Sequence, residues 1–176
     1  MANSYSTSLR LIIQTTGENS GTWGNYTNTN LGTLLEQAIT GIGAIAVSGS
    51  SDYTLTVTNG ASDESRNAIL NVTGTLTAAI NVICPAVTKA YTIKNATTGG
   101  YAITLKTASG TGISVPNGAT MLLYCNGTNV VEGITNINSL TAASLTLSGN
   151  LSVAGTVSGV GFSNYLASPP AIGGTA

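Results

Sequence analysis

The chain has 176 residues, a net charge of −1 and only 6% charged residues, whereas soluble proteins usually carry about 25%. This balance excludes a field that would attract nucleic acid or an anionic membrane. The absence of histidine removes the commonest general base and metal ligand, and two cysteines are too few for a zinc site. We therefore expect no catalytic residue, no metal and no cofactor.

The first 43 residues are predicted to contain a strand-like segment and one helix, over residues 30–42. Alternating residues from Tyr5 to Ile13 share one side of the strand-like segment. The helix carries a single apolar stripe, at i, i+3, i+4, i+7, i+8 and i+11: Leu31, Leu34, Leu35, Ala38, Ile39 and Ile42. Its predicted N-cap is Asn28, Thr29 or Asn30, and it is predicted to end at Gly41 or Gly43.

A helix of about three turns is unstable alone in water, so the apolar stripe must pack on a partner. That partner is this chain's own β-domain, an identical copy or a larger assembly. Trp23, just before the predicted helix, either anchors the chain in a partner's pocket or packs the helix on its own domain. The same two alternatives apply to Tyr5 and Tyr26.

Residues 44–135 read as short strands separated by turn signals about every ten residues. Apolar and polar residues alternate along them, and Asn59-Gly60 and Asn126-Gly127 are turn signals, the second typical of a tight hairpin. This pattern predicts a central antiparallel β-sandwich or small barrel. Cys84 and Cys125 lie in apolar runs, which favours buried free thiols over a disulfide.

Two charged residues, Asp63 and Arg66, stand between predicted strands, where a structural contact or cap is favoured over a ligand-binding pair. Glycoside hydrolysis would need two suitably spaced carboxylates. Asp63 and Glu64 are the only acids close in sequence, and adjacent residues on a strand point to opposite faces. We therefore expect no enzymatic activity.

Residues 136–176 contain a hexad repeat that reads SLTLSG, NLSVAG and TVSGVG from residue 144. A single chain cannot bury the apolar side chains of this repeat or pair its backbone, whereas three chains around one axis can do both. The repeat predicts a trimeric β-fibre shaft whose core residues are Leu145, Leu147, Leu151, Val153, Val157 and Val160. The alternative is a disordered linker, which would not need registered Leu and Val.

Several segments resemble the N-terminal part of tail-fibre and related virion proteins of marine tailed phages. They include TGENSGTWG at residues 16–24, DESRN at 63–67, CPAV at 84–87, VPNG at 115–118 and YLASPPAIGGT at 165–175. The resemblance covers nearly the whole chain. It implies a homotrimeric fibre whose N-terminal part attaches to the particle, without distinguishing a tail protein from a capsid protein as the anchor.

The sequence therefore predicts a mainly β protein in three parts: a virion-attachment segment over 1–43, a β-domain over 44–135 and a shaft with a Pro/Gly linker over 136–176. The expected attachment interface is formed by Trp23, Tyr26, Leu31, Leu34, Leu35, Ile39 and Ile42. The expected partners are two identical copies and a tail or capsid protein. The N-terminus lacks the features of a signal peptide, and no stretch approaches a membrane helix in length. We therefore expect synthesis in the host cytoplasm, a final location in the virion and no membrane insertion.

Two alternatives remain open at this stage. The chain could be a receptor-binding or glycan-binding adhesion module that contacts host surface glycans through a distal part, or a decoration fibre attached to the capsid.

Overall fold

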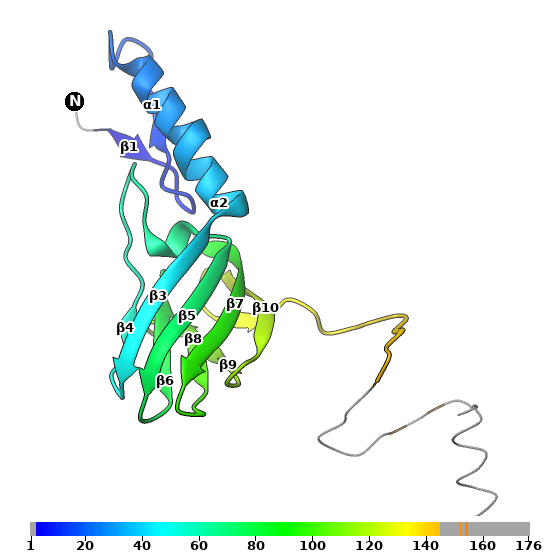
Figure 1. Ribbon diagram of the computed structural model, residues 1–176. Helices are drawn as coiled ribbons and strands as arrows, with labels where there is room; N and C mark the ends of the chain where they lie inside the picture. Colours follow the sequence, from blue (N-terminus) through cyan, green and yellow to red (C-terminus); the bar gives the residue numbers. More distant parts are fainter. Residues whose placement is uncertain (1–2, 145–151, 153, 155–176) are drawn as a thin grey trace, which may run out of the picture. The chain divides into compact units, whose positions relative to one another are not determined.

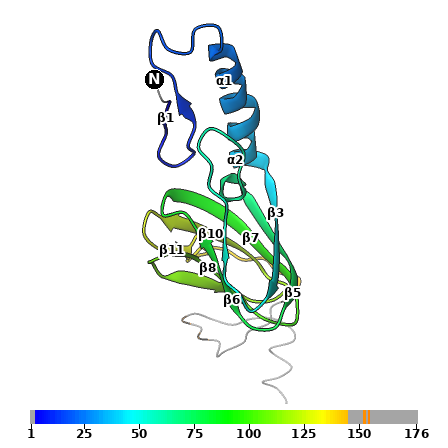
Figure 2. The ribbon, with the colours of Figure 1, turned by 90° about the vertical axis from the view of Figure 1, so that its left-hand side faces the viewer.

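The computed structural model describes residues 3–144, 152 and 154, which divide into a unit ending at Ile137 and a second unit beginning at Asn138. In the first unit an arm made of a short hairpin and a helix extends from a two-layered β-structure (Figures 1 and 2). The described residues are mainly β, as predicted. The trimeric shaft remains a prediction.

The hairpin of the arm consists of two short antiparallel strands, β1 (Ser4–Tyr5) and β2 (Ile12–Ile13). The prediction of a continuous strand-like segment from Tyr5 to Ile13 is therefore wrong for residues 6–11. The chain turns back there, and Arg10 adopts a positive φ of 51°. The turn is held by hydrogen bonds that the backbone N–H groups of Leu11 and Arg10 donate to Ser6.

The helix of the arm is longer at its start than predicted. It runs without interruption through α1 (Trp23–Thr29), the wider turns of η1 (Asn30–Leu35) and α2 (Glu36–Thr40). The chain becomes extended at Gly41, one of the two predicted end points. Ile42 lies outside the helix and begins strand β3.

The predicted N-cap residues lie inside this helix. The side-chain amide of Asn30 instead brackets the peptide of Ile12: the Ile12 N–H donates to Asn30 Oδ1 at 3.0 Å, and Asn30 Nδ2 donates to the Ile12 carbonyl at 2.8 Å. Gln14 also donates a hydrogen bond to the Thr27 hydroxyl. These contacts with the hairpin stabilise a helical start that residues 23–30, poor in strong helix formers, would not maintain alone.

In the described residues, nine strands form two stacked sheets at the base of the arm. The five-stranded sheet has the order β11-β10-β7-β5-β3, and the four-stranded sheet has the order β4-β6-β8-β9. Their bounds are β3 Ile42–Gly49, β4 Tyr53–Thr54, β5 Ile69–Leu76, β6 Ile80–Cys84, β7 Thr88–Thr98, β8 Ile103–Thr107, β9 Gly112–Val115, β10 Thr120–Asn126 and β11 Val130–Glu132. A single turn of 3-10 helix, η2 (Glu64–Arg66), precedes β5.

The strands do not form the antiparallel arrangement that we predicted. From β3 to β8 the chain passes from one sheet to the other at each turn, so β3, β5 and β7 are parallel in one sheet and β4, β6 and β8 are parallel in the other. The remaining pairings are antiparallel: β9 pairs with β8, β10 pairs with β7, and β11 pairs with β10. The prediction failed because alternation and turn residues identify strands but not the sheet that the next strand joins.

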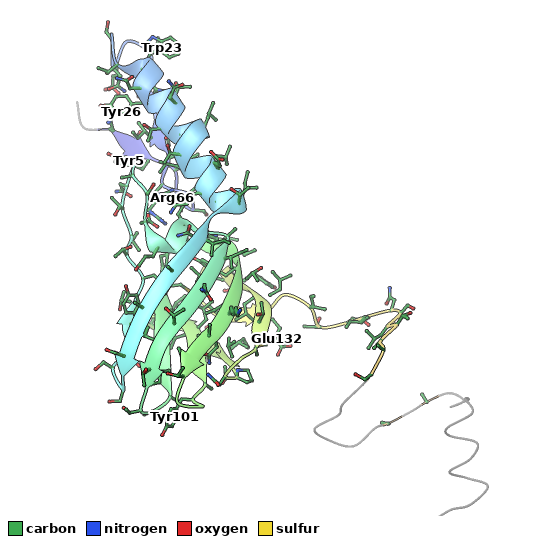
Figure 3. All side chains as sticks on the ribbon, viewed as in Figure 1. Tyr5, Trp23, Tyr26, Arg66, Tyr101 and Glu132 are labelled. Atoms are coloured by element: carbon green, nitrogen blue, oxygen red, sulfur yellow. The ribbon has the colours of Figure 1, made fainter. Side chains whose placement is uncertain are left out.

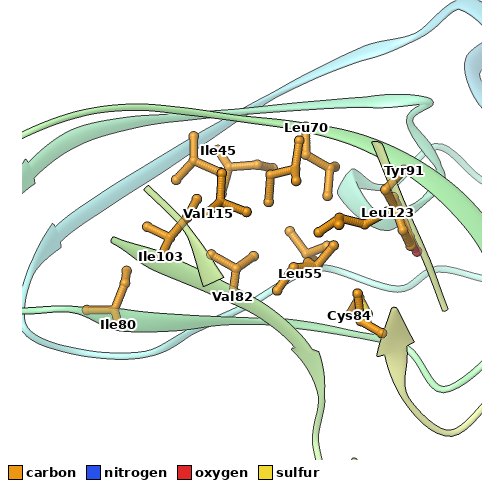
Figure 4. Close-up of a cluster of buried hydrophobic side chains, with 14 of the residues drawn as sticks. Ile45, Leu55, Leu70, Ile80, Val82, Cys84, Tyr91, Ile103, Val115 and Leu123 are labelled. Atoms are coloured by element: carbon orange, nitrogen blue, oxygen red, sulfur yellow. The ribbon is translucent and has the colours of Figure 1, made fainter. Parts of the chain in front are cut away.

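The core lies between the two sheets (Figure 4). Alternate residues of each strand point inward, as the sequence pattern predicted. The fully buried side chains include Ile45, Leu70, Val72, Tyr91, Ile93 and Leu123 on one side and Leu55, Val82, Ile103, Leu105 and Val115 on the other. The predicted hairpin at Asn126-Gly127 is present between β10 and β11.

The polar side chain of Asn95, on β7, is fully buried. Its side-chain amide donates to the carbonyls of Tyr101 and Val115, each at 3.0 Å, and its oxygen accepts hydrogen bonds from the backbone N–H and hydroxyl of Thr97. Because the amide nitrogen and oxygen both have hydrogen-bond partners, burying this side chain costs little free energy. Its hydrogen bonds connect β7 to Tyr101 and Val115.

Candidate functional site

A buried cluster of charged residues joins the arm to the β-structure. The carboxylate of Asp63 accepts hydrogen bonds from Arg10 at 2.8 and 3.0 Å and from Arg66 at 3.1 Å. It also accepts the Ser65 hydroxyl and the backbone N–H groups of Thr58 and Arg66. Arg66 lies where the arm meets the sheets (Figure 3). The predicted structural role of Asp63 and Arg66, as a contact and cap that fix a loop, is confirmed.

The electrostatics of the cluster keep Asp63 ionised. Burial alone would raise the pKa of Asp63. The hydrogen bonds from Thr58, Arg10 and Ser65, together with the charge of Arg10, outweigh it and hold this pKa below the ordinary value. Burial, aided by the positive charges of Arg10 and Arg66, lowers the pKa of nearby Lys89 to about 8. The cluster therefore acts as an ionic lock between the arm and the sandwich.

The third member of the lock, Arg10, was missed by sequence reasoning. It is 53 residues from Asp63 along the chain, and nothing in its local pattern distinguishes it from a solvent-exposed arginine. Its backbone carbonyl accepts a hydrogen bond from the N–H of Gly60, at 2.9 Å. A Cβ at Gly60 would stand 2.9 Å from side-chain atoms of Ile12 and Tyr5, so only glycine lets this loop approach the hairpin so closely.

The helix of the arm exposes several large apolar side chains. Trp23 is 62% exposed, Leu31 59% and Ile39 66%, and Ile42 continues the exposed series at the start of β3. Trp23 lies near the far end of the arm, and Tyr26 follows it along the helix (Figure 3). Large apolar side chains exposed together along one element are typical of interaction surfaces.

Three of the proposed interface residues are less accessible than the others. Leu34 is fully buried, and Tyr26 and Leu35 are partly buried. Among the residues that the structure describes, Leu34 and Ile12 are the buried apolar side chains outside the sandwich core, and both belong to the arm. The apolar residues of the predicted stripe therefore differ in their surroundings. Leu34 is buried and stabilises the arm, whereas Leu31 and Ile39 are exposed and available to a partner.

The predicted shaft core, Leu145, Leu147, Leu151, Val153, Val157 and Val160, lies outside the described residues.

Asp63 and Glu64, the two carboxylates considered for catalysis, and also Asp52 accept hydrogen bonds that fix loops. Glu64 accepts the Tyr53 hydroxyl at 2.7 Å and the Thr56 N–H at 2.8 Å, next to the fully engaged Asp63. Asp52 accepts the backbone and side-chain N–H groups of Asn81. In the described part of the chain no group of three or more Cys, Asp or Glu residues is placed to bind a metal.

Both cysteines are buried and not bridged, as the sequence favoured. Burial, reinforced by the neighbouring Cys125, raises the pKa of the Cys84 thiol to about 12. A thiol that remains protonated at neutral pH is a poor nucleophile.

Comparison of the chain with protein-family models, curated proteins and solved structures finds no match. Within the described residues, no helix has the length and apolar character needed to cross a membrane.

Proposed function

We propose that this chain is a non-enzymatic structural subunit of a phage fibre, in which three copies assemble and the N-terminal arm attaches them to the virion. The observation that carries the proposal is the arm itself. It is locked to the sandwich by buried ion pairs, yet it presents Trp23, Leu31 and Ile39 to solvent.

The combination of a rigid base and an exposed apolar side suits docking. An element that projects unsupported would lose much of its binding energy to ordering, whereas a pre-organised arm loses less. Aromatic and aliphatic side chains of this kind are the usual anchors of a protein interface. The near absence of charge also suits dense packing of identical subunits, because neighbouring copies do not repel one another.

The test uses substitutions at exposed positions of the arm helix. Leu31→Asp with Ile39→Asp should abolish incorporation into particles and leave the β-sheet circular dichroism and thermal midpoint nearly unchanged, because both side chains are exposed. The matched control is Thr33→Asp, which places a charge at another exposed position of the same helix. Incorporation is measured by mass spectrometry of purified particles.

Normal incorporation of the double variant would refute attachment through this side of the arm. Cryo-electron microscopy of the particle supplies the independent test, since the proposal requires threefold density of this chain emerging from a tail or capsid protein. A monomeric chain in sedimentation experiments would refute the fibre proposal as a whole.

A further inference from the structure

The segment that follows the last strand carries a second exposed apolar series. After Gly133, whose N–H donates to the Leu122 carbonyl at 2.9 Å, residues 134–144 form neither helix nor strand and make no hydrogen bond to other described residues. Ile134, Ile137 and Leu140 are 57%, 59% and 61% exposed. These large side chains are each three residues apart.

A spacing of three is informative about how the chain winds. In a flat strand side chains alternate between faces, so Ile134 and Ile137 would point in opposite directions. In an extended chain with three residues per turn they share one line, and such a chain makes no internal hydrogen bonds. This matches a segment whose backbone groups find no partner within the described chain.

The lack of charge in the segment indicates that its partner is another copy of this chain. Glu132 is the last charged residue, and residues 133–176 contain no Asp, Glu, Lys or Arg. A basic or acidic partner would find no complementary charge there, whereas identical copies can approach closely without repulsion. Between the apolar residues stand Thr135, Asn136, Asn138 and Ser139, whose short polar side chains can face water around a narrow bundle.

The surface where the segment begins also favours association. Met121, Leu122, Glu132 and Ile134 line a shallow hollow of about 220 Å³. Leu122 is itself exposed on β10. A neighbouring copy that aligns its segment with this one would therefore meet an indented surface that is apolar except for Glu132.

We infer that Ile134, Ile137 and Leu140 form the first layers of the core between identical chains, so that self-association starts immediately after β11 and ten residues before the hexad repeat. This inference rests on the proposed trimeric fibre and specifies where its interchain core begins. Three chains that each complete a turn every three residues direct these side chains towards a common axis, with the polar residues outside. The chains must lie further apart than in a close-wound triple helix, where only glycine fits at the axis.

The test is disulfide cross-linking in the full 176-residue chain. Ile137→Cys is compared with Asn136→Cys and Asn138→Cys, and the unsubstituted chain gives the background because its own two thiols are buried. After mild oxidation of dilute protein, Ile137→Cys should form disulfide-linked dimers at least tenfold faster than either neighbour, measured by non-reducing electrophoresis. A disulfide requires Cα atoms within about 7 Å, so it reports close approach at the axis.

Faster cross-linking at positions 136 and 138 would indicate a flat strand and would overturn the inference. Equal rates at all three positions would overturn it as well. If sedimentation of the unsubstituted chain still gave a trimer in either case, the proposed function would stand and only the position of the interchain core would be wrong. Absence of disulfide-linked dimers of Ile137→Cys, in a chain that still sediments as a trimer, would also contradict the inference.

Discussion

At the scale of single residues, Asp63 has the largest structural role outside the apolar core. Its carboxylate receives two arginines, a hydroxyl and two backbone N–H groups. A buried ion group of this kind does not by itself imply high stability, but removing one partner leaves uncompensated charge and is costly. The ion pairs between the arm and the sandwich therefore share one acidic side chain.

Asp63→Asn should destabilise the folded chain by about 3–5 kcal/mol, because Arg10 and Arg66 would then be buried without a counter-charge. The folded-state pKa of Asp63 lies below its ordinary value of 3.8. Its stabilising contribution is thus complete above pH 3.8 and is lost as the pH falls through the folded-state pKa. In urea denaturation, the unfolding free energy should fall less between pH 7 and pH 2 for Asp63→Asn than for the unsubstituted chain.

Asp52→Asn is the matched control for this substitution. Asp52 is exposed, and among the described residues its carboxylate accepts hydrogen bonds from Asn81 alone. Loss of its charge should therefore change the unfolding free energy little. Similar destabilisation by both substitutions would contradict the lock.

At the scale of elements, the parallel strands depend on close approach of β3 and β5. Gly74 in β5 has a φ of 119°, and a Cβ at this position would collide with the carbonyl oxygen of Val47 in β3. The parallel register pairs Val47 with Gly74 directly. Glycine is thus required at this point for both backbone conformation and packing.

Gly74→Ala should therefore destabilise the sandwich by roughly 3 kcal/mol or more, since it combines backbone strain with overpacking. Gly32→Ala is the contrasting variant, because Gly32 lies in the helix with open space around its Cα. It should stabilise the chain by about 0.5–1 kcal/mol through the higher helix propensity of alanine. Thermal unfolding followed by circular dichroism measures both, and a tolerated Gly74→Ala would contradict the close pairing of β3 with β5.

The sequence predicted helix and strands where the spacing of apolar residues is regular. It did not predict which strands pair with one another. The inward residues of β5, β6, β7 and β8 alternate as the sequence pattern indicated. The start of the helix was misplaced because residues 23–29 are helical through contact with the hairpin, and local propensity contains no information about that contact.

At the scale of the whole molecule, the proposed assembly depends on surfaces with very little charge. Only five basic and six acidic residues are present, and Arg10, Arg66 and Asp63 among them are buried in the lock. Association between such surfaces is driven by apolar burial rather than by ion pairs.

The oligomer should therefore persist when sodium chloride is raised from 0.1 to 1 M, because there are few interchain charges for salt to screen. Ammonium sulfate at matched ionic strength should shift the equilibrium further towards the oligomer, since sulfate strengthens apolar burial. Sedimentation velocity measures both effects. Dissociation at 1 M sodium chloride would indicate an interface based on ion pairs.

Composition and periodicity alone determined that the chain is rich in strands, has little charge, and carries a helix with a stripe of apolar residues. These properties are local, because each depends on neighbouring residues and their spacing. Only the tertiary structure decided that the strands from β3 to β8 run parallel within their sheets, that Leu34 faces inward while Leu31 and Ile39 face outward, and that Arg10 joins Asp63 across 53 residues. Such pairings depend on contacts between distant segments, which form only when the whole chain has folded.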